Sequence, residues 1–169
     1  MLNIPEYKEY GGETKIALMD NSSLAFMHEL SQRSYPSDGI LSVYDLILIP
    51  KWVMEEIEDS TYRSTYVEQL QAKGYPIRWI DETKYGAFVN DEDVNLYYIV
   101  EAAVSRVSEL MRFLRRKVKT EDLIDLPSAE EWMNRLYDEW PIHGRTLSTG
   151  RTLKKNAGEI SLTILAEIF

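Results

Sequence analysis

The chain contains no cysteine and only two histidines, His28 and His143. The absence of cysteine excludes disulfides, iron–sulfur clusters, thiolate nucleophiles and zinc–thiolate sites. Two histidines are too few for a multi-histidine metal centre. Any metal ion that this protein binds would therefore be held by oxygen ligands.

Long hydrophobic runs are missing as well. No stretch of the sequence reaches the roughly 18 apolar residues that a membrane span needs, and the first residues show no basic start followed by an apolar block. The 169 residues, 44% hydrophobic and 28% charged, are enough for one domain with an ordinary core. We expect a cytoplasmic protein that does not contact the membrane.

Basic residues are fewer than acidic ones, 19 against 28, and the net charge is −9. A chain of this charge is not a general coat for nucleic acid. One stretch departs from this average, because residues 141–158 contain no acid. Its basic residues are His143, Arg145, Arg151, Lys154 and Lys155. We predict a loop here that could bind phosphate groups.

Three short apolar runs, 15–19, 45–49 and 76–80, predict buried strands. Helical patterns cover 22 or 23 to 32, 50–73, 93–119, 128–139 and 156–169. This alternation predicts a three-layer α/β/α fold with a central, mostly parallel sheet. We expect residues 1–13 to form an arm or small edge element and residues 14–169 the domain, with 82–140 as an extended helical region. In such folds, sites form at the carboxyl ends of the strands.

Asp20 directly follows the first predicted strand, "KIALM". Its place at the carboxyl end of a parallel strand makes it the first candidate for a functional acid. The alternative is that Asp20 only caps the helix that follows. The sequence leaves both interpretations open.

Glu56 is the second candidate. At about 100° per residue, it lies at the border of the apolar stripe formed by Val53 and Ile57, whereas Glu55 and Glu58 point away. A half-buried carboxylate needs a cation or a metal ion. The alternative is a boundary glutamate whose carboxylate reaches water.

Glu159, in "NAGEIS", is the third candidate. Together with Thr163 and Glu167 it lines one strip of the last predicted helix. The alternative is that Asn156 and Glu159 form a capping pair and that the strip faces solvent.

Three pieces, in this order, resemble the PIN-domain nucleases. "IALMDNSSL" resembles the first strand and first acid of that family. "YDLILIPKWVMEEIE" is similar to its second strand followed by P-x-x-V-x-x-E, and "NAGEISLTILA" to the stretch that opens the helix with the third acid. The matches span most of residues 15–169.

This resemblance implies a PIN-type endoribonuclease, toxin-like or RNA-processing, that cleaves single-stranded RNA, less often DNA, with Mg²⁺ or Mn²⁺. Hard divalent ions of this kind prefer carboxylate oxygens. The implied catalytic residues and metal ligands are Asp20, Glu56 and Glu159. Ser22 and Thr163 would support them, and the substrate backbone would bind Arg145, Arg151, Lys154 and Lys155.

The sequence departs from the family pattern at its end. Members usually continue into another strand that ends in a fourth acid, whereas this chain stops at Phe169. A truncated sequence, an incomplete site and a fold used without catalysis all remain open. The competing function is a non-catalytic PIN-like interaction module, in which a partner protein covers the apolar last helix. A homodimer is a separate expectation. A receiver-like domain is a weaker alternative, because it would have an acid pair after the first strand and only Asp20 is there.

Overall fold

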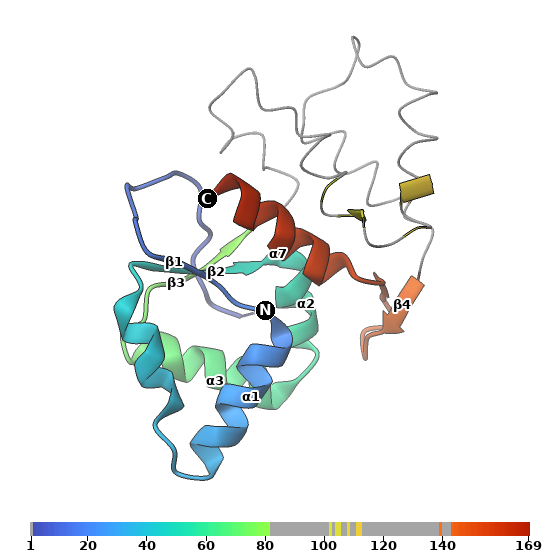
Figure 1. Cartoon of the computed structure of the whole chain (residues 1–169). Helices are drawn as coiled ribbons and strands as arrows, with labels where there is room; N and C mark the ends of the chain where they lie inside the picture. The colour runs from blue at the N-terminus through green and yellow to red at the C-terminus, as the bar shows by residue number, and fades with distance from the viewer. Residues whose placement is uncertain are drawn as a thin grey trace. The chain divides into compact units, whose positions relative to one another are not determined.

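The computed structural model describes residues 2–81, 102, 104, 105, 108, 111, 112, 139 and 143–169. The chain divides into two compact units, Met1–Asp81 and Glu82–Phe169. The described elements of the first unit (Figure 1) are β1 (Ile16–Leu18), α1 (Asn21–Gln32), the 3-10 helix η1 (Ser37–Val43), β2 (Leu46–Pro50), α2 (Lys51–Glu58), α3 (Thr61–Ala72) and β3 (Ile77–Ile80). Those of the second unit are β4 (His143–Thr146), β5 (Thr152–Lys154) and α7 (Ala157–Ile168).

The first unit is built on a parallel sheet in the order β1-β2-β3. In its register, Ile47 of the central strand pairs with Ala17 on one side and Ile77 on the other. All five residues of β2 are buried, as expected for a parallel strand that is covered on both faces. The prediction of a mixed α/β fold with a parallel sheet is confirmed.

The core of the first unit joins β2 and β3 to three helices. Ile47 and Ile49 lie on one face of β2, because side chains along a strand alternate between faces. Leu46 and Leu48 lie on the other face and are buried too. The members of the core cluster that lie on α-helices are Leu24 and Met27 of α1, Val53, Met54 and Ile57 of α2, and Tyr66, Val67 and Leu70 of α3.

The single helix predicted for residues 50–73 is wrong, because the segment forms two helices. Ser60 has an extended backbone (φ −124°, ψ 110°) between α2 and α3, and its carbonyl accepts the N–H of Ser64 at 3.0 Å. Serine and aspartate form local backbone hydrogen bonds more readily than they continue a helix. The pair Asp59-Ser60 is therefore a natural break, which turns α3 back toward the start of β3.

The N-terminal arm extends the sheet beyond β3. The N–H of Tyr7 donates to the carbonyl of Trp79 at 2.7 Å, and Leu2 and Ile4 are buried in the core of the unit. Burial, together with a hydrogen bond donated to Glu13, raises the pKa of Tyr7 to about 12. The arm is thus part of the first unit.

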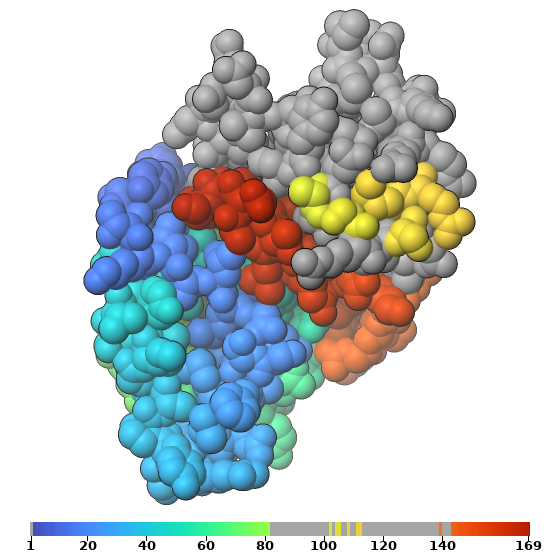
Figure 2. All heavy atoms as spheres, viewed as in Figure 1, coloured from blue at the N-terminus to red at the C-terminus, as the bar shows by residue number. Residues whose placement is uncertain are grey.

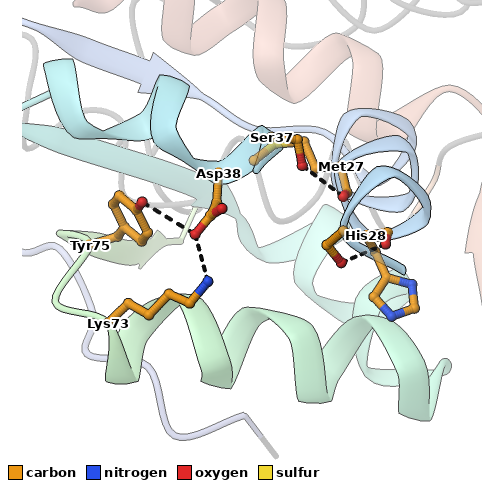
Figure 3. A network of polar contacts seen from close by, with 7 residues as sticks. Met27, His28, Ser37, Asp38, Lys73 and Tyr75 are labelled. Carbon is orange, nitrogen blue, oxygen red and sulfur yellow. Dashed lines mark hydrogen bonds and ion pairs between the residues drawn. The ribbon is translucent and has the colours of Figure 1, made fainter. Parts of the chain in front are cut away.

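At the amino end of the sheet, before β2 and β3 begin, Asp38 binds two side chains. Its Oδ2 accepts from Lys73 Nζ at 2.7 Å and from the hydroxyl of Tyr75 at 3.3 Å (Figure 3). The hydrogen bond from Lys73 holds the pKa of Asp38 below its usual value, and the bond to Asp38 raises the pKa of Lys73. This cluster fixes η1 to the end of α3.

Asp45, also at the amino end, joins the starts of β1 and β2. Its Oδ2 accepts from the N–H groups of Thr14 at 3.3 Å and Lys15 at 3.1 Å. Hydrogen bonding to the backbone of Lys15 lowers the pKa of Asp45. A carboxylate that accepts backbone N–H bonds satisfies donors that the strands leave open.

In the second unit, β4 and β5 form an antiparallel hairpin. Its turn contains Gly150, with φ +84°, whose N–H donates to the carbonyl of Leu147 at 2.9 Å. Leu147 and Leu153 are buried. α7 follows within residues 156–169, as predicted, and its buried residues are Ala157, Gly158, Ile160, Ser161, Ile164 and Leu165.

The helices predicted at 93–119 and 128–139 lie largely outside the described residues. Within the first, residues 102, 104, 108, 111 and 112 are helical and Ser105 is in a turn. Of the helices that the structure describes, none has the length and apolar character needed to cross a membrane.

Candidate functional site: the carboxyl end of the sheet

Asp20 lies at the carboxyl end of the sheet, just beyond β1. Met19 still pairs with β2, its N–H donating to the carbonyl of Leu48 at 2.9 Å, so Asp20 leaves the sheet from a fixed point. Its Oδ1 accepts the N–H of Ser23 at 2.6 Å and caps α1. The helix therefore begins at Asn21, earlier than the predicted start at 22 or 23. Ser22 itself is exposed.

Capping by Asp20 does not decide between the two interpretations of this residue. The cap engages one carboxylate oxygen, Oδ1, and carboxylates have two oxygens that together accept several bonds. The preference of aspartate for the cap position explains why the chain folds this way locally. It also fixes the orientation of the Asp20 carboxylate at the first turn of α1.

Glu56, on α2, is tied to the residue that follows Asp20. Asn21 Nδ2 donates to Glu56 Oε2 at 3.0 Å in a partly buried environment. Glu56 is half-buried, in keeping with its predicted place at the border of the apolar stripe. The first unit therefore brings Glu56 to the end of β1 where Asp20 lies.

The prediction that Glu55 points away from the body of the protein is wrong, since Glu55 is half-buried as well. The reason is that α2 is short and contacts β2, β3, α1 and α3, so it lacks a broad outward face. Glu58 is exposed, as predicted, and its Oε1 accepts the N–H of Leu2 at 2.7 Å.

Arg63 of α3 completes a chain of hydrogen bonds that sequence reasoning missed. Its Nη1 donates to Asn21 Oδ1 at 2.5 Å, while the amide of Asn21 donates to Glu56. Arg63, at the start of α3, is thus linked through Asn21 of α1 to the carboxylate of Glu56 on α2. No local sequence pattern predicts these hydrogen bonds, because the bonded residues lie 35 and 42 positions apart in the sequence.

Asp81 is a second residue that sequence reasoning missed. It follows β3 as Asp20 follows β1, is buried with 8% of its surface exposed, and its Oδ2 lies 3.1 Å from Lys51 Nζ. Lys51 begins α2, directly after β2. The signal was present in "RWID", an apolar strand followed by an acid.

Glu159 belongs to the second unit, in the first turn of α7, and is exposed. The predicted capping pair does not form in the usual way. Asn156 is at the cap position with φ 61°, but its side chain makes no capping hydrogen bond. The hydroxyl of Thr163, also exposed, donates to the carbonyl of Glu159 at 2.9 Å.

The acid-free stretch 141–158 contains the hairpin β4–β5, and the prediction of a loop is wrong there. Alternation places Leu147 and Leu153 inside, and Gly144 allows a close approach, since a Cβ at this position would lie 3.3 Å from the carbonyl oxygen of Leu153. The exposed basic residues of the stretch are His143, Arg145, Arg151 and Lys155, and Lys154 is partly buried.

Among the residues that the structure describes, no group of three or more histidine, aspartate or glutamate side chains is placed to hold a metal ion. Comparisons with models of known protein families, with curated proteins and with solved structures found no match. The resemblance to PIN nucleases therefore rests on the three sequence pieces, and the activity that it implies is a proposal.

Proposed function

We propose that this chain is a PIN-type endoribonuclease with a three-layer α/β/α fold, which hydrolyses phosphodiester bonds of single-stranded RNA with Mg²⁺ or Mn²⁺. The observation that carries the proposal is the hydrogen bond of 3.0 Å between Asn21 and Glu56. It ties the second acid of the pattern to the residue next to the first, Asp20. This is the end of a parallel sheet at which ligands bind in open α/β folds.

Two carboxylates suit one mode of magnesium binding. Mg²⁺ usually keeps several waters and is held by one or two carboxylates together with the phosphates of the substrate. Asp20 and Glu56 would supply the two carboxylates of this mode. When bound, the ion would activate a water for attack on the phosphodiester and offset charge on the leaving oxygen.

Within this proposal, Glu159 is the third acid because the resemblance of "NAGEISLTILA" to the PIN pattern implies it. Its carboxylate is exposed, so it is accessible to a ligand. Thr163 and Ser22 are the proposed supporting residues. The hydroxyl of Thr163 donates to the backbone carbonyl of Glu159, and Ser22 lies in the first turn of α1.

The hairpin residues Arg145, Arg151, Lys154 and Lys155 would bind the phosphate backbone. Charged contacts of this kind make the affinity for nucleic acid depend on salt, because each neutralised phosphate releases counterions. Replacing Arg145 and Arg151 by Gln should weaken RNA binding at low salt and make the salt dependence shallower. The same change would leave binding untouched if the hairpin is not part of the interface.

A second function, a non-catalytic interaction module, is favoured by one observation. The helices α1 and η1 contact each other and lie side by side in Figure 2, and both expose large apolar side chains. These are Phe26 on α1, and Ile40 and Val43 on η1. Loss of a protein complex on substitution of Phe26 and Ile40 by Ser, with no cleavage by the parent chain, would favour this alternative.

The test of the nuclease proposal is Mn²⁺-dependent cleavage of a fluorescent single-stranded RNA. Asp20→Asn and Glu56→Gln should each lower the rate at least about 100-fold, because they remove charge where the cation would bind. Asp38→Asn is the matched control, since it removes one carboxylate from the opposite end of the sheet. Cleavage that survives both Asp20→Asn and EDTA would overturn the proposal.

A further inference from the structure

The first part of the N-terminal arm, residues 2–7, which we call the arm segment, lies at one edge of the sheet, beside β3. The N–H of Tyr7 donates to the carbonyl of Trp79 at 2.7 Å, and the N–H of Trp79 donates to the carbonyl of Pro5 at 3.1 Å. The chain then continues into β1, which is at the opposite edge, since the strand order is β1-β2-β3. A connector, residues 8–14, joins the arm segment to a strand that it does not pair with.

The arm segment is anchored by side chains as well as by its backbone. Leu2 and Ile4 are buried in the core cluster of the first unit, and Tyr7 is buried too. The N–H of Leu2 donates to Glu58 Oε1 at 2.7 Å. Alternate buried side chains, together with backbone hydrogen bonds to a sheet edge, are the features of strand addition, in which an extended segment joins a sheet of another chain. These contacts belong to the arm segment and not to the connector.

The connector, by contrast, is exposed except at Glu13. Glu13 Oε2 accepts from the N–H of Gly11 at 2.9 Å and from the hydroxyl of Tyr7 at 3.1 Å. Gly12 turns the chain with φ +85°, in the left-handed region that glycine enters without steric cost. The path that returns the chain to β1 of the same copy therefore rests on one glycine and a few hydrogen bonds.

We propose that the edge of β3 takes the arm segment of a second copy of this chain, so that two copies form a dimer by exchanging their arms. The exchanged dimer keeps the contacts of the arm segment with β3 and Glu58 and changes the path of the connector, which makes exchange a low-cost route to a dimer. A second copy is the fitting partner because it carries the same Leu2 and Ile4 at the same spacing. Since the arm contacts are equal in both forms, the connector and the protein concentration decide between monomer and dimer.

The first experiment measures the monomer–dimer equilibrium by analytical ultracentrifugation across the micromolar range. Gly12→Val strains the connector in the monomer, because a β-branched residue rarely adopts a positive φ, whereas in the dimer the connector takes another path. The association constant should rise at least about 10-fold, since two strained connectors are relieved in each dimer.

The matched control is Gly74→Val. Gly74 also has a positive φ, +91°, and a Cβ at either glycine would have nothing within 4 Å. It lies between α3 and β3, outside the connector, so its replacement strains monomer and dimer alike and should leave the association constant unchanged. If either valine variant does not fold, as judged by circular dichroism, alanine replaces valine at both positions.

The second experiment shows which copy supplies the arm. The chain has no cysteine, so Pro5→Cys/Arg78→Cys introduces two thiols on a background without any. These positions lie opposite each other, because Glu6 and Trp79 form a parallel bridge, and a short bifunctional maleimide can join them. The isolated dimer should give a covalent dimer on denaturing electrophoresis, and Pro5→Cys alone should not.

Three results would overturn the proposal. The first is a parent chain that stays monomeric throughout the concentration range. The second is a dimer in which the two thiols are joined within one chain, and the third is an association constant that changes equally in both glycine variants, because the copies would then meet through another surface. Neither measurement involves RNA or a metal ion, so the result is independent of the nuclease proposal.

Discussion

The two ends of the parallel sheet treat their carboxylates in different ways. At the amino end, Asp38 and Asp45 accept directly from a lysine, a tyrosine hydroxyl and backbone N–H groups, and the pKa of each is lowered. At the carboxyl end, Asp20 caps a helix, and Glu56 is held by a neutral amide. In the first arrangement the carboxylates fix loops at the starts of the strands. In the second, one carboxylate caps α1 and the other links α2 to Asn21.

Asp81 shows that the difference is not simply one of position. It lies at the carboxyl end but is paired with Lys51 at 3.1 Å, in the manner of Asp38 with Lys73. The comparison therefore teaches that a site acid is recognised by what holds it as well as by where it lies. Each prediction below changes one side of this comparison.

The largest effect is expected for Ile47→Ala, because β2 is the central strand of the sheet. Ile47 is fully buried between β1 and β3, and truncating such a side chain costs about 2–5 kcal/mol of unfolding free energy. Urea unfolding measures this loss. The control is Val43→Ala, at an exposed position, which should cost less than about 0.5 kcal/mol. Equal costs would show that β2 is not the core strand.

The next effect is expected for Lys51→Met. This change removes the cation that Asp81 contacts while Asp81 stays buried, and it should lower the unfolding free energy at pH 7 by about 2 kcal/mol. The matched change Lys51→Arg keeps the charge and should recover most of that loss. A Lys51→Met protein as stable as the parent would mean that the pair does not stabilise the fold.

A smaller loss of stability than that of Lys51→Met is expected for Asp38→Asn, because Lys73 is largely exposed and such pairs are weak. RNA cleavage should not change. Asp20→Asn should show the reverse pattern, since asparagine is also a good helix cap and yet cleavage should be lost. If both variants lost stability and cleavage to the same extent, the two ends of the sheet would not differ in function.

The smallest effect is the pH dependence of stability at the amino end. The pKa values of Asp38 and Asp45 are lowered on folding, so their contribution is complete above the unfolded pKa of about 4 and is lost as the pH falls through the folded values. Urea unfolding at pH 6 and pH 3 should show this loss, and the difference should shrink in the double variant Asp38→Asn/Asp45→Asn. An unchanged difference would exclude these two residues as its source.

The raised pKa of Lys73 makes the stability of the fold depend on pH in the alkaline range as well. Its contribution is present below the unfolded pKa of about 10.5 and is lost as the pH rises through the folded value. Because the amine is paired with Asp38, Asp38→Asn should remove this alkaline loss as well.

The strands were predictable because an apolar run of four or five residues between turn signals is typical of a buried strand and too short for most helices. The runs 15–19, 45–49 and 76–80 contain β1 and β3 and all of β2 but Pro50. The break at Ser60 was not predicted, because the periodicity of apolar residues continues through it. The hairpin was not predicted, because its first strand, His143–Thr146, is short and exposed throughout.

The candidate site was predictable only in part. Asp20 and Glu56 could be found from a strand end and a helical stripe, which are local features. Arg63 could not, because its role depends on a contact across 42 residues of sequence. Asp81 is predictable from the same local feature as Asp20, because "RWID" is an apolar strand followed by an acid.

By itself, the sequence determined the absence of cysteine chemistry, the parallel strands and the acids at their ends, because these follow from composition and short-range pattern. Only the tertiary structure decided what holds each acid. A lysine reaches Asp81 and an asparagine reaches Glu56 because helices that start far apart in the chain meet at one end of the sheet. A carboxylate's partner is a property of packing, and the sequence specifies it only through the fold.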